Sequence, residues 1–263
     1  MSLSFATEFC INVAITAGIS IMKIYKKEDL VIEHKADNSP LTIADRISND
    51  IIVSALQKEY PTYAILSEEM YGEDCKSRID NDYCFVVDPL DGTREFISRN
   101  GQFTVNIALC HKGNPAVGVI YVPATEEIYF AYEGGGAFYK SNWDAHPVKI
   151  SVTDKLTELV LVGSRSHSTF KEECLRKQNA HLISDFISVG SSLKGCMVAG
   201  GIADVYYRFG PTWEWDTAAM QCIVEQSGGI VRQMNGITMT YNRINPRNEK
   251  GFFVVNRQEN IWL

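Results

Sequence analysis

Residues 84–93 begin with an apolar run, which predicts a buried strand, and continue with two closely spaced carboxylates, Asp88 and Asp91. Pro89 has a fixed φ angle and favours an extended conformation at Asp88. The Asp91–Gly92 pair that follows is typical of a tight turn. The two carboxylates and the intervening backbone carbonyl can therefore converge on one point, as the oxygen ligands of a hard divalent cation do. The alternative is a strand that simply ends in an acidic turn.

Two further acidic residues lie at the ends of predicted elements. Glu68 follows an apolar run at 64–66, so a second strand end delivers a carboxylate. Asp216 precedes the small residues of a helix predicted over 216–226. Asp216 alone could be only a helix N-cap, a role that is compatible with metal binding.

Asp45 is predicted to face inward from a helix over residues 42–59. It lies in line with Ile52 and Leu56 at near-helical multiples, and Ile43 begins the same apolar stripe. A buried carboxylate needs a cation, a hydrogen-bond donor or a water molecule as its partner. The alternative is an aspartate at the edge of the helix that bonds to a nearby loop.

Residues 3–26 predict a long amphipathic helix. Its apolar residues recur at helical spacing, at Phe5, Phe9, Val13 and Ala17. Its polar face is not strongly basic, which favours packing on the protein core over a role at a membrane surface. No uninterrupted apolar run in the chain is long enough to span a bilayer, so we expect no transmembrane segment.

The middle of the chain predicts an antiparallel meander. Strand-like runs occupy residues 103–109, 117–122 and 128–132, and short turns separate them. The glycine-rich segment 133–136 lacks the G-x-G-x-x-G pattern between a strand and a helix. It therefore predicts a turn and not a dinucleotide-binding loop.

The sequence pattern changes near residues 141–147, and strands and helices then alternate. Strands are predicted at 160–162, 187–189, 203–207 and 252–255, and helices at 170–178, from about 192, and at 216–226. The change predicts two lobes, with helices, an antiparallel sheet and most carboxylates in residues 1–146. Residues 147–263 would form a mixed α/β lobe that carries Asp216, and the crevice between the lobes would hold the site.

The composition is that of a globular protein. Its 263 residues are 45% hydrophobic and 22% charged, enough to bury a large core. The net charge of -7 argues against nonspecific nucleic-acid binding, which relies on positive charge. Seven scattered cysteines without a C-x-x-C pair predict reduced thiols and a cytoplasmic protein, with peripheral association at the inner face of the membrane as the alternative. No basic region of a secretory signal is evident at the start.

Several motifs together resemble those of the inositol monophosphatase superfamily of lithium-sensitive, magnesium-dependent phosphatases. D-P-L-D-G-T at 88–93 is similar to the first metal-binding motif of that family. The S-P-x-T-x-x-D pattern that ends at Asp45, S-E-E at 67–69 and W-D at 215–216 extend the resemblance over most of the chain. It implies an α/β (α+β) fold, the layered αβαβα sandwich of the inositol monophosphatase and fructose-1,6-bisphosphatase type.

The resemblance implies a site for two or three Mg²⁺ ions. One ion would be held by Glu68, Asp88 and the carbonyl of Leu90, and another by Asp88, Asp91 and Asp216. All of these except Asp88 would also contact the substrate. Two metals about 3.5–4 Å apart can neutralise phosphate oxygens, activate an in-line water and stabilise the leaving group.

The same resemblance assigns roles around the attacking water. Glu68 and Thr93 would orient the water, and Asp45 is a further candidate base. The backbone N–H groups of Gly92 and Thr93 would hold phosphate oxygens. No nucleophile motif stands out, so the implied reaction is direct attack by water without a covalent phospho-enzyme.

Four short segments resemble the 3'(2'),5'-bisphosphate nucleotidase branch of the family. They are R-E-F at 94–96, S-R-S-H at 164–167, G-S-S-L-K at 190–194 and R-F-G-P at 208–211. A substrate with a second phosphate needs an anion site away from the metals, and Ser191, Lys194 and Arg208 could form it. His167 could contact that phosphate or the base. The implied substrate is the nucleotide adenosine 3',5'-bisphosphate, together with its phosphosulfate analogue.

Alternative functions remain open at this point. An inositol monophosphatase, acting on a singly phosphorylated polyol, would not need Lys194 or Arg208. Fructose-1,6-bisphosphatase fits the basic residues less well, and a non-catalytic nucleotide- or metal-binding regulator is the alternative from another class. Met220 stands where the branch commonly has glycine, so we expect different packing beside Asp216. No oligomeric state follows from the sequence.

Overall fold

The structure is a computed structural model that describes residues 2–27, 32–34, 40–71, 76–166 and 168–263. Its helices are α1 (Leu3–Tyr25), α2 (Ile43–Glu59), α3 (Lys76–Ile79), α4 (Thr93–Ile97), α5 (Phe170–Gln178), α6 (Leu193–Ala199) and α7 (Glu214–Gln226), with 3-10 turns η1 (Glu68–Met70) and η2 (Gln258–Asn260). Its strands up to the middle of the chain are β1 (Ile32–His34), β2 (Pro40–Thr42), β3 (Ala64–Ser67), β4 (Tyr83–Asp91), β5 (Thr104–His111), β6 (Asn114–Val122), β7 (Glu127–Tyr132), β8 (Gly136–Lys140) and β9 (Val148–Ile150). The later strands are β10 (Leu159–Ser164), β11 (Ile183–Val189), β12 (Val205–Arg208), β13 (Thr212–Trp213), β14 (Ile230–Gln233), β15 (Arg247–Asn248) and β16 (Phe252–Val255).

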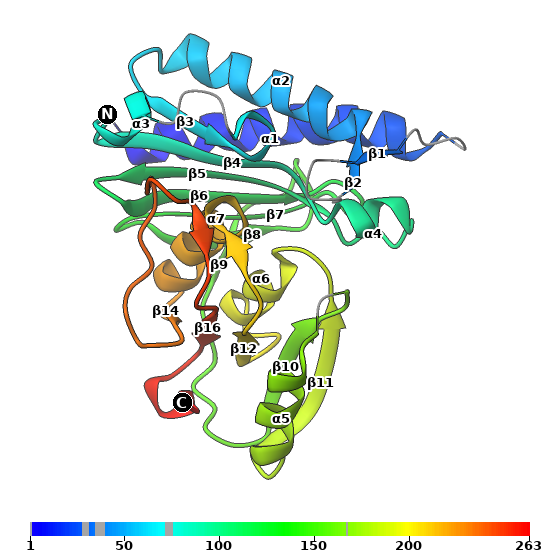
Figure 1. The fold of residues 1–263 in the computed structure, drawn as a ribbon, viewed down its shortest axis with the longest axis vertical. Coiled ribbons are helices and arrows are strands. Elements are labelled where there is room, and N and C mark those ends of the chain that lie inside the picture. The colour runs from blue at the N-terminus through cyan, green and yellow to red at the C-terminus, as the bar shows by residue number, and fades with distance from the viewer. Residues whose placement is uncertain (1, 28–31, 35–39, 72–75, 167) are drawn as a thin grey trace.

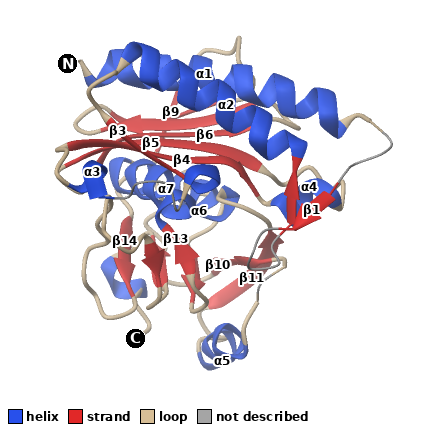
Figure 2. Ribbon diagram, turned by 45° about the horizontal axis from the view of Figure 1, so that its top comes forward, coloured by secondary structure: helices blue, strands red, loops and turns tan. Residues whose placement is uncertain are grey.

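The elements stack in five layers (Figure 1). Helices α1 and α2 cover one face of a seven-stranded sheet, and α6 and α7 lie between that sheet and a five-stranded one. Helix α5 packs on the outer face of the five-stranded sheet. The alternation of helical and strand layers is also visible in Figure 2. This is the αβαβα sandwich predicted from the sequence.

Helix α1 lies close to the first sheet because its buried face is made of small and branched side chains. The buried positions repeat every three or four residues and include Ala6, Cys10, Val13, Ala14, Ala17 and Ile21. A Cβ atom added at Gly18 would overlap the ring of Tyr121 on β6, so only glycine permits this approach. The predicted stripe is wrong at one position, since Phe5 is 54% exposed and the buried face passes through Ala6 instead.

By length and composition alone, α1 could also cross a membrane, because it has 23 residues and a mean hydropathy of 1.6. Core helices pass the same test. The burial of one face of α1 against the first sheet agrees with the predicted role in core packing. The absence of a transmembrane segment stays a prediction.

Helix α2 begins one residue later than predicted, because Thr42 is its N-cap. Ile52 and Leu56 face the core as predicted, with no exposed surface. The prediction is wrong for Ile43, which is 54% exposed at the first position of the helix.

The seven-stranded sheet has the order β3-β4-β5-β6-β7-β8-β9. Strand β3 is parallel to β4 and all other neighbours are antiparallel, which confirms the predicted meander. The glycine-rich segment 133–136 forms the predicted turn between β7 and β8. Strand β9 extends this sheet beyond residue 146. The division into two lobes at that residue stays a prediction.

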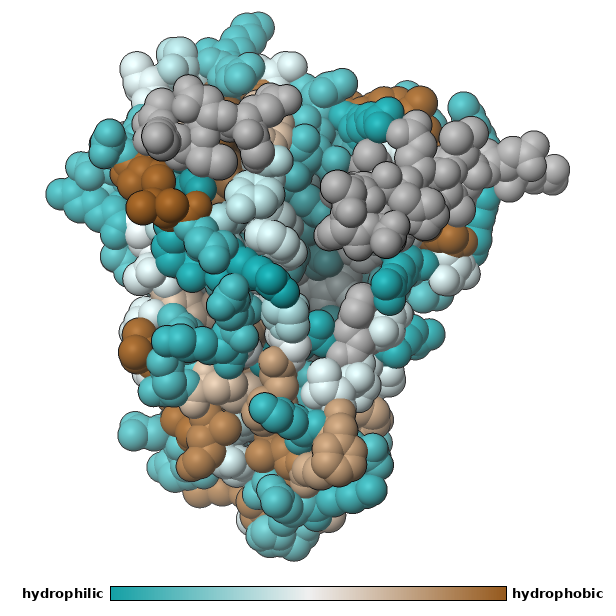
Figure 3. Space-filling view, viewed as in Figure 1, coloured by the Kyte–Doolittle hydropathy of each residue, from teal (hydrophilic) through white to brown (hydrophobic). Residues whose placement is uncertain are grey.

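The five-stranded sheet has the order β11-β10-β12-β16-β14 and is mixed, as predicted. Strand β10 is parallel to both β11 and β12, whereas β16 is antiparallel to β12 and β14. Leu175 of α5 packs over the outer face with Leu161, Tyr207 and Phe253. On the molecular face in Figure 3, hydrophobic residues gather mainly in the lower half of the view, where this sheet and α5 lie.

Candidate active site

Three carboxylates meet at the end of β4 and the start of α7. Asp88, Asp91 and Asp216 each offer an oxygen atom, and these atoms lie within 4.8 Å of one another. In a regular strand Asp88 and Asp91, three positions apart, would point to opposite faces. The pairing of β4 with β5 is irregular between these two residues, and this bulge lets both side chains converge. The convergence predicted from the Asp-Pro-Leu-Asp spacing is therefore confirmed.

Asp216 lies in the first turn of α7, at the third helical position and not at the N-cap, which is Trp213. The backbone N–H of Trp213 donates to Asp216 Oδ2 over 2.7 Å, so the carboxylate does help to begin the helix. Its burial, followed by the charges of Asp91 and Glu68, raises the pKa of Asp216 well above its usual value. A cluster of oxygen ligands with mutual repulsion fits a hard divalent cation, which would offset that repulsion.

Asp91 is held by side chains from two other elements. Its Oδ2 atom accepts hydrogen bonds from Ser191 Oγ at 2.8 Å and from Ser192 Oγ at 2.7 Å. Asn106 Nδ2 of β5 donates to Ser192 Oγ at 2.9 Å and lies 3.4 Å from Asp91 Oδ2. Ser192 Oγ also lies 3.1 Å from the carbonyl oxygen of Asp216, so its one proton can be directed to either acceptor and the hydroxyl connects β4 with α7.

Asp45 forms the predicted inward-facing carboxylate and is buried. Its Oδ2 atom accepts hydrogen bonds from the backbone N–H and the hydroxyl of Thr42, at 2.8 and 2.7 Å, which close a capping box on α2. Thr93 Oγ1 donates to Asp45 Oδ1 at 3.3 Å. Thr42 is the N-cap of α2 and Thr93 is the first residue of α4, so these partners of Asp45 lie at helix ends and not in a loop. An acceptor beside the Thr93 hydroxyl fixes the direction of its proton.

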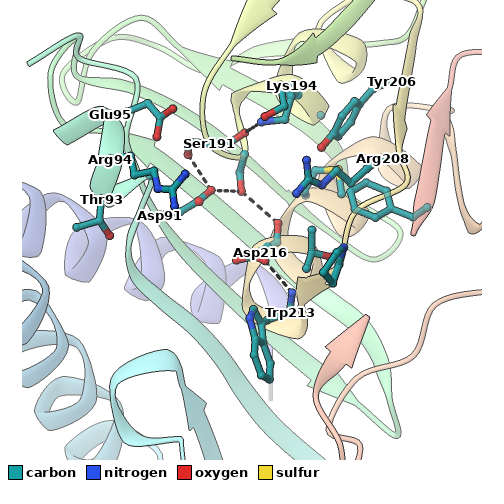
Figure 4. A pocket seen from close by; sticks show the side chains of 18 of the residues that line it. Asp91, Thr93, Arg94, Glu95, Ser191, Lys194, Tyr206, Arg208, Trp213 and Asp216 are labelled. Carbon is teal, nitrogen blue, oxygen red and sulfur yellow. Dashed lines mark hydrogen bonds between the residues drawn. The ribbon is translucent and has the colours of Figure 1, made fainter. Parts of the chain in front are cut away.

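A cavity of about 290 Å³ opens over the acidic cluster, a size that suits a small molecule. It is lined by Glu68 of η1, by Asp91 and Asp216, and by the segment 92–95 at the start of α4. Figure 4 shows Thr93 and Asp91 on one side of this cavity and Tyr206 and Arg208 on the other.

Lys194 is the most buried cation in this cavity, with 7% of its surface exposed. Its Nζ atom donates to the carbonyl of Ser191 and lies 5.5 Å from the centroid of the Tyr206 ring. Burial lowers the pKa of Lys194, although the negative charge of Asp91 partly opposes this effect. Arg208, at the end of β12, lines the same cavity, so the structure brings Ser191, Lys194 and Arg208 together.

Gly92, Leu90 and His167 are the remaining predicted site residues. Gly92 has a φ angle of 89°, and it precedes α4 with Thr93 at the cavity wall. Leu90 lies between Asp88 and Asp91 in the sequence. Its side chain is buried in the hydrophobic core, and its backbone N–H donates to Asp88 Oδ1 at 3.1 Å. His167 lies outside the described residues. The roles of all these residues in metal or substrate binding stay predictions.

Glu95 and Met220 also belong to the cavity wall, and the sequence assigned neither of them a role in the site. Glu95 is buried and accepts a hydrogen bond from Ser166 Oγ at 2.5 Å, which connects α4 to the end of β10. Met220 of α7 lines the cavity, and a Cβ atom added at Gly195 would overlap its side chain. Met220 thus packs over a glycine of α6, and the expected difference in packing beside Asp216 stays a prediction.

The sequence profile of the inositol monophosphatase family matches residues 2–258. The 3'(2'),5'-bisphosphate nucleotidase CysQ of Salmonella typhimurium is 40% identical over 232 residues, which are 88% of this chain and 91% of that protein. CysQ of Escherichia coli K12 is 41% identical over 235 residues, with the same shares of both chains.

Solved structures agree with this grouping. CysQ from Bacteroides thetaiotaomicron, a bacterial member of the inositol monophosphatase family, superposes with a TM-score of 0.84 at 39% identity over 96% of this chain and 98% of its own. The extragenic suppressor protein suhB from Bartonella henselae superposes with a TM-score of 0.80 at 26% identity over 98% of each chain. The chain therefore belongs to the inositol monophosphatase family.

Proposed function

We propose that the protein is a metal-dependent 3'(2'),5'-bisphosphate nucleotidase. Its reaction is hydrolysis of the 3'-phosphate of adenosine 3',5'-bisphosphate to AMP and phosphate, and of the corresponding phosphate of the phosphosulfate analogue. The observation that carries this proposal is a single cavity that opens over the acidic cluster and is lined by cations that include Lys194 and Arg208. The nucleotidase relatives, about 40% identical over most of the chain, support it.

The acidic cluster is proposed to hold two Mg²⁺ ions, or three. Asp88, Asp91 and Asp216 would provide carboxylate oxygens, together with Glu68 and the carbonyl of Leu90. When bound, Mg²⁺ would supply neutralisation of the phosphate oxygens and acidification of water. The contacts of Ser192 Oγ with Asp91 and Asp216 would keep these ligands oriented.

Thr93 and Asp45 would direct the proton of the attacking water. The Thr93 hydroxyl donates to Asp45, so its free lone pairs can accept a hydrogen bond from a water in the cavity. Glu68, on the wall of the same cavity, would hold the second proton of that water. The backbone N–H groups of Gly92 and Thr93 would bind phosphate oxygens at the start of α4.

The 5'-phosphate would bind between Lys194 and Arg208, with Ser191 beside it. Burial lowers the pKa of Lys194, and a phosphate dianion in contact with its Nζ atom would raise it again by favouring the charged form. Arg208 offers a planar fork of donors that suits phosphate oxygens. His167 would contact this phosphate or the base. An inositol monophosphate has no group for this part of the cavity.

The protein is proposed to act in the cytoplasm on a small-molecule nucleotide, with no nucleic-acid partner. The net charge of -7 and the six free cysteines among the described residues support this setting. Peripheral association with the inner face of the membrane is the alternative, and we propose no oligomeric state.

Phosphate release from adenosine 3',5'-bisphosphate and from inositol 1-phosphate, each with Mg²⁺ and with a chelator, tests the proposal. We expect metal-dependent preference for the nucleotide. Lys194→Ala should reduce kcat/KM about tenfold or more for the nucleotide, since a charge-assisted hydrogen bond is lost, and should spare inositol 1-phosphate. Preference for inositol 1-phosphate would make the protein an inositol monophosphatase. Metal or nucleotide binding without turnover of either ester would favour the non-catalytic regulator.

A further inference from the structure

An aromatic cluster lies beside the acidic site and outside the roles assigned above. Tyr71 packs against both Trp213 and Trp215, with ring centroids 5.4 and 5.7 Å away. The two indole rings are themselves stacked, at 5.1 Å and an angle of 5°. Arg247 of β15 lies over the Trp213 ring, with its guanidinium carbon 6.0 Å from the ring centroid.

The members of this cluster are directly attached to two of the acidic segments. Tyr71 ends the 3-10 turn that starts at Glu68, and its backbone N–H donates to the carbonyl of Glu68 at 3.3 Å. The N–H of Trp213 donates to Asp216 Oδ2, and Trp215 is the residue before Asp216. The rings therefore form a side-chain contact between the turn that carries Glu68 and the helix that carries Asp216.

The two segments need such a contact because their charges oppose it. Glu68 and Asp216 line one cavity, and two carboxylates that face the same space repel each other. Glu68 belongs to a turn of only three residues, which packs against β4 and α2, and the rings add a contact with α7. Tyr71 is 44% exposed, so its ring is only partly used to fill the core, and its contacts are with Trp213 and Trp215.

We propose that Tyr71 is a positioning residue whose ring, clasped against Trp213 and Trp215, holds Glu68 opposite Asp216 for binding of a divalent cation. The inference rests on the proposed metal site and adds to it a residue that is not a ligand. Each aromatic contact of this kind contributes a modest amount of free energy, and Tyr71 makes two of them. Loss of the ring would remove one of the contacts that hold the turn of Glu68 against α7.

The test is calorimetric titration of the metal-free protein with MgCl₂, in the wild type and in three variants. Tyr71→Ala should bind Mg²⁺ about tenfold more weakly, which corresponds to about 1.4 kcal/mol. Tyr71→Phe keeps the ring and should bind as the wild type does. Phe170→Ala removes a side chain of α5 that is 79% exposed and does not line the cavity, and is the matched control for loss of a surface ring.

A second measurement separates positioning from loss of folding. Tyr71→Ala should require about tenfold more Mg²⁺ for half-maximal hydrolysis and regain most of the wild-type kcat at saturating Mg²⁺. Equal Mg²⁺ affinity of Tyr71→Ala and the wild type, or an equal loss in Tyr71→Phe, would overturn the proposal. A wild-type protein that binds Mg²⁺ but does not hydrolyse the nucleotide would contradict the proposed substrate and leave the binding comparison valid.

Discussion

Thr93, the first residue of α4, connects the buried Asp45 of α2 with the cavity. Its hydroxyl donates to Asp45, which is itself held by Thr42, so the chain of hydrogen bonds starts at the beginning of α2. Asp45 is almost fully buried, whereas Thr93 lines the cavity. Because the buried carboxylate accepts the proton of the Thr93 hydroxyl, it fixes the orientation of that hydroxyl at the cavity wall.

Replacement of Thr93 tests this arrangement at the scale of one atom group. Thr93→Ala should lower kcat about 10²–10⁴-fold, the usual contribution of a positioned proton acceptor. Thr93→Ser keeps the hydroxyl and should retain most of the activity, while both variants bind Mg²⁺ like the wild type in calorimetry. A Thr93→Ala enzyme with an unchanged kcat would exclude the hydroxyl from the reaction.

Individual ligand candidates were predictable because their local patterns are strong. Asp88 and Asp91 end an apolar strand around a proline, and this pattern showed that they lie close together, although their convergence also needs the bulge in the pairing of β4 with β5. Ser192 and Asn106 were not predictable, because their contacts with Asp91 join segments that the sequence does not show to be neighbours. A polar Asn106 within an apolar strand was the one available signal.

Helices α6 and α7 meet at a contact that sets the shape of the cavity wall. Gly195 follows Lys194 on α6 and faces Met220 of α7, with no room for a Cβ atom between them. Both Lys194 and Met220 line the cavity. The spacing of these two helices therefore determines where the ammonium group of Lys194 lies.

A pair of substitutions tests that contact. Gly195→Ala should raise KM for adenosine 3',5'-bisphosphate and destabilise the fold by about 1–3 kcal/mol, the usual effect of overpacking. Met220→Ala creates space at the same point, so the double variant should recover much of the lost stability, as coupled neighbours do. Thermal unfolding and KM measured for all four proteins provide the check. Purely additive effects would contradict a direct contact.

The longer helices lie close to their predicted ranges, whereas short elements such as α4, β8 and β14 were not predicted and the faces of two helices were wrong. The apolar periodicity of α1 and α2 indicates helices, yet Phe5 and Ile43 are exposed at their first turns. Periodicity alone does not show where a helix leaves the sheet that it covers, because the first turn can project beyond the neighbouring strands. The helix α5, in contrast, matches its predicted range of 170–178.

At the scale of the whole molecule, the site joins both sheets. Asp91 ends β4 of the seven-stranded sheet, Arg208 ends β12 of the five-stranded sheet, and Asp216 belongs to a helix between them. The order of layers was predictable by resemblance to the family, whereas composition and periodicity showed only a change of pattern midway. A cation bound at this junction would stabilise the fold as a whole, because unfolding separates all of its ligands.

Metal binding and folding should therefore be linked, and Asp216 offers the test. At 100 times its dissociation constant Mg²⁺ should add about 2.7 kcal/mol to the free energy of unfolding, or about 5–10 °C in Tm for a chain of this size. Without metal, Asp216→Asn should have a Tm at or above that of the wild type, because one of three repelling charges is removed while Trp213 keeps an acceptor. With Mg²⁺ the order should reverse, since the variant lacks a charged ligand. Differential scanning calorimetry with Mg²⁺ and with chelator measures both orders, and a variant that gains as much Tm from Mg²⁺ as the wild type would place the cation away from Asp216.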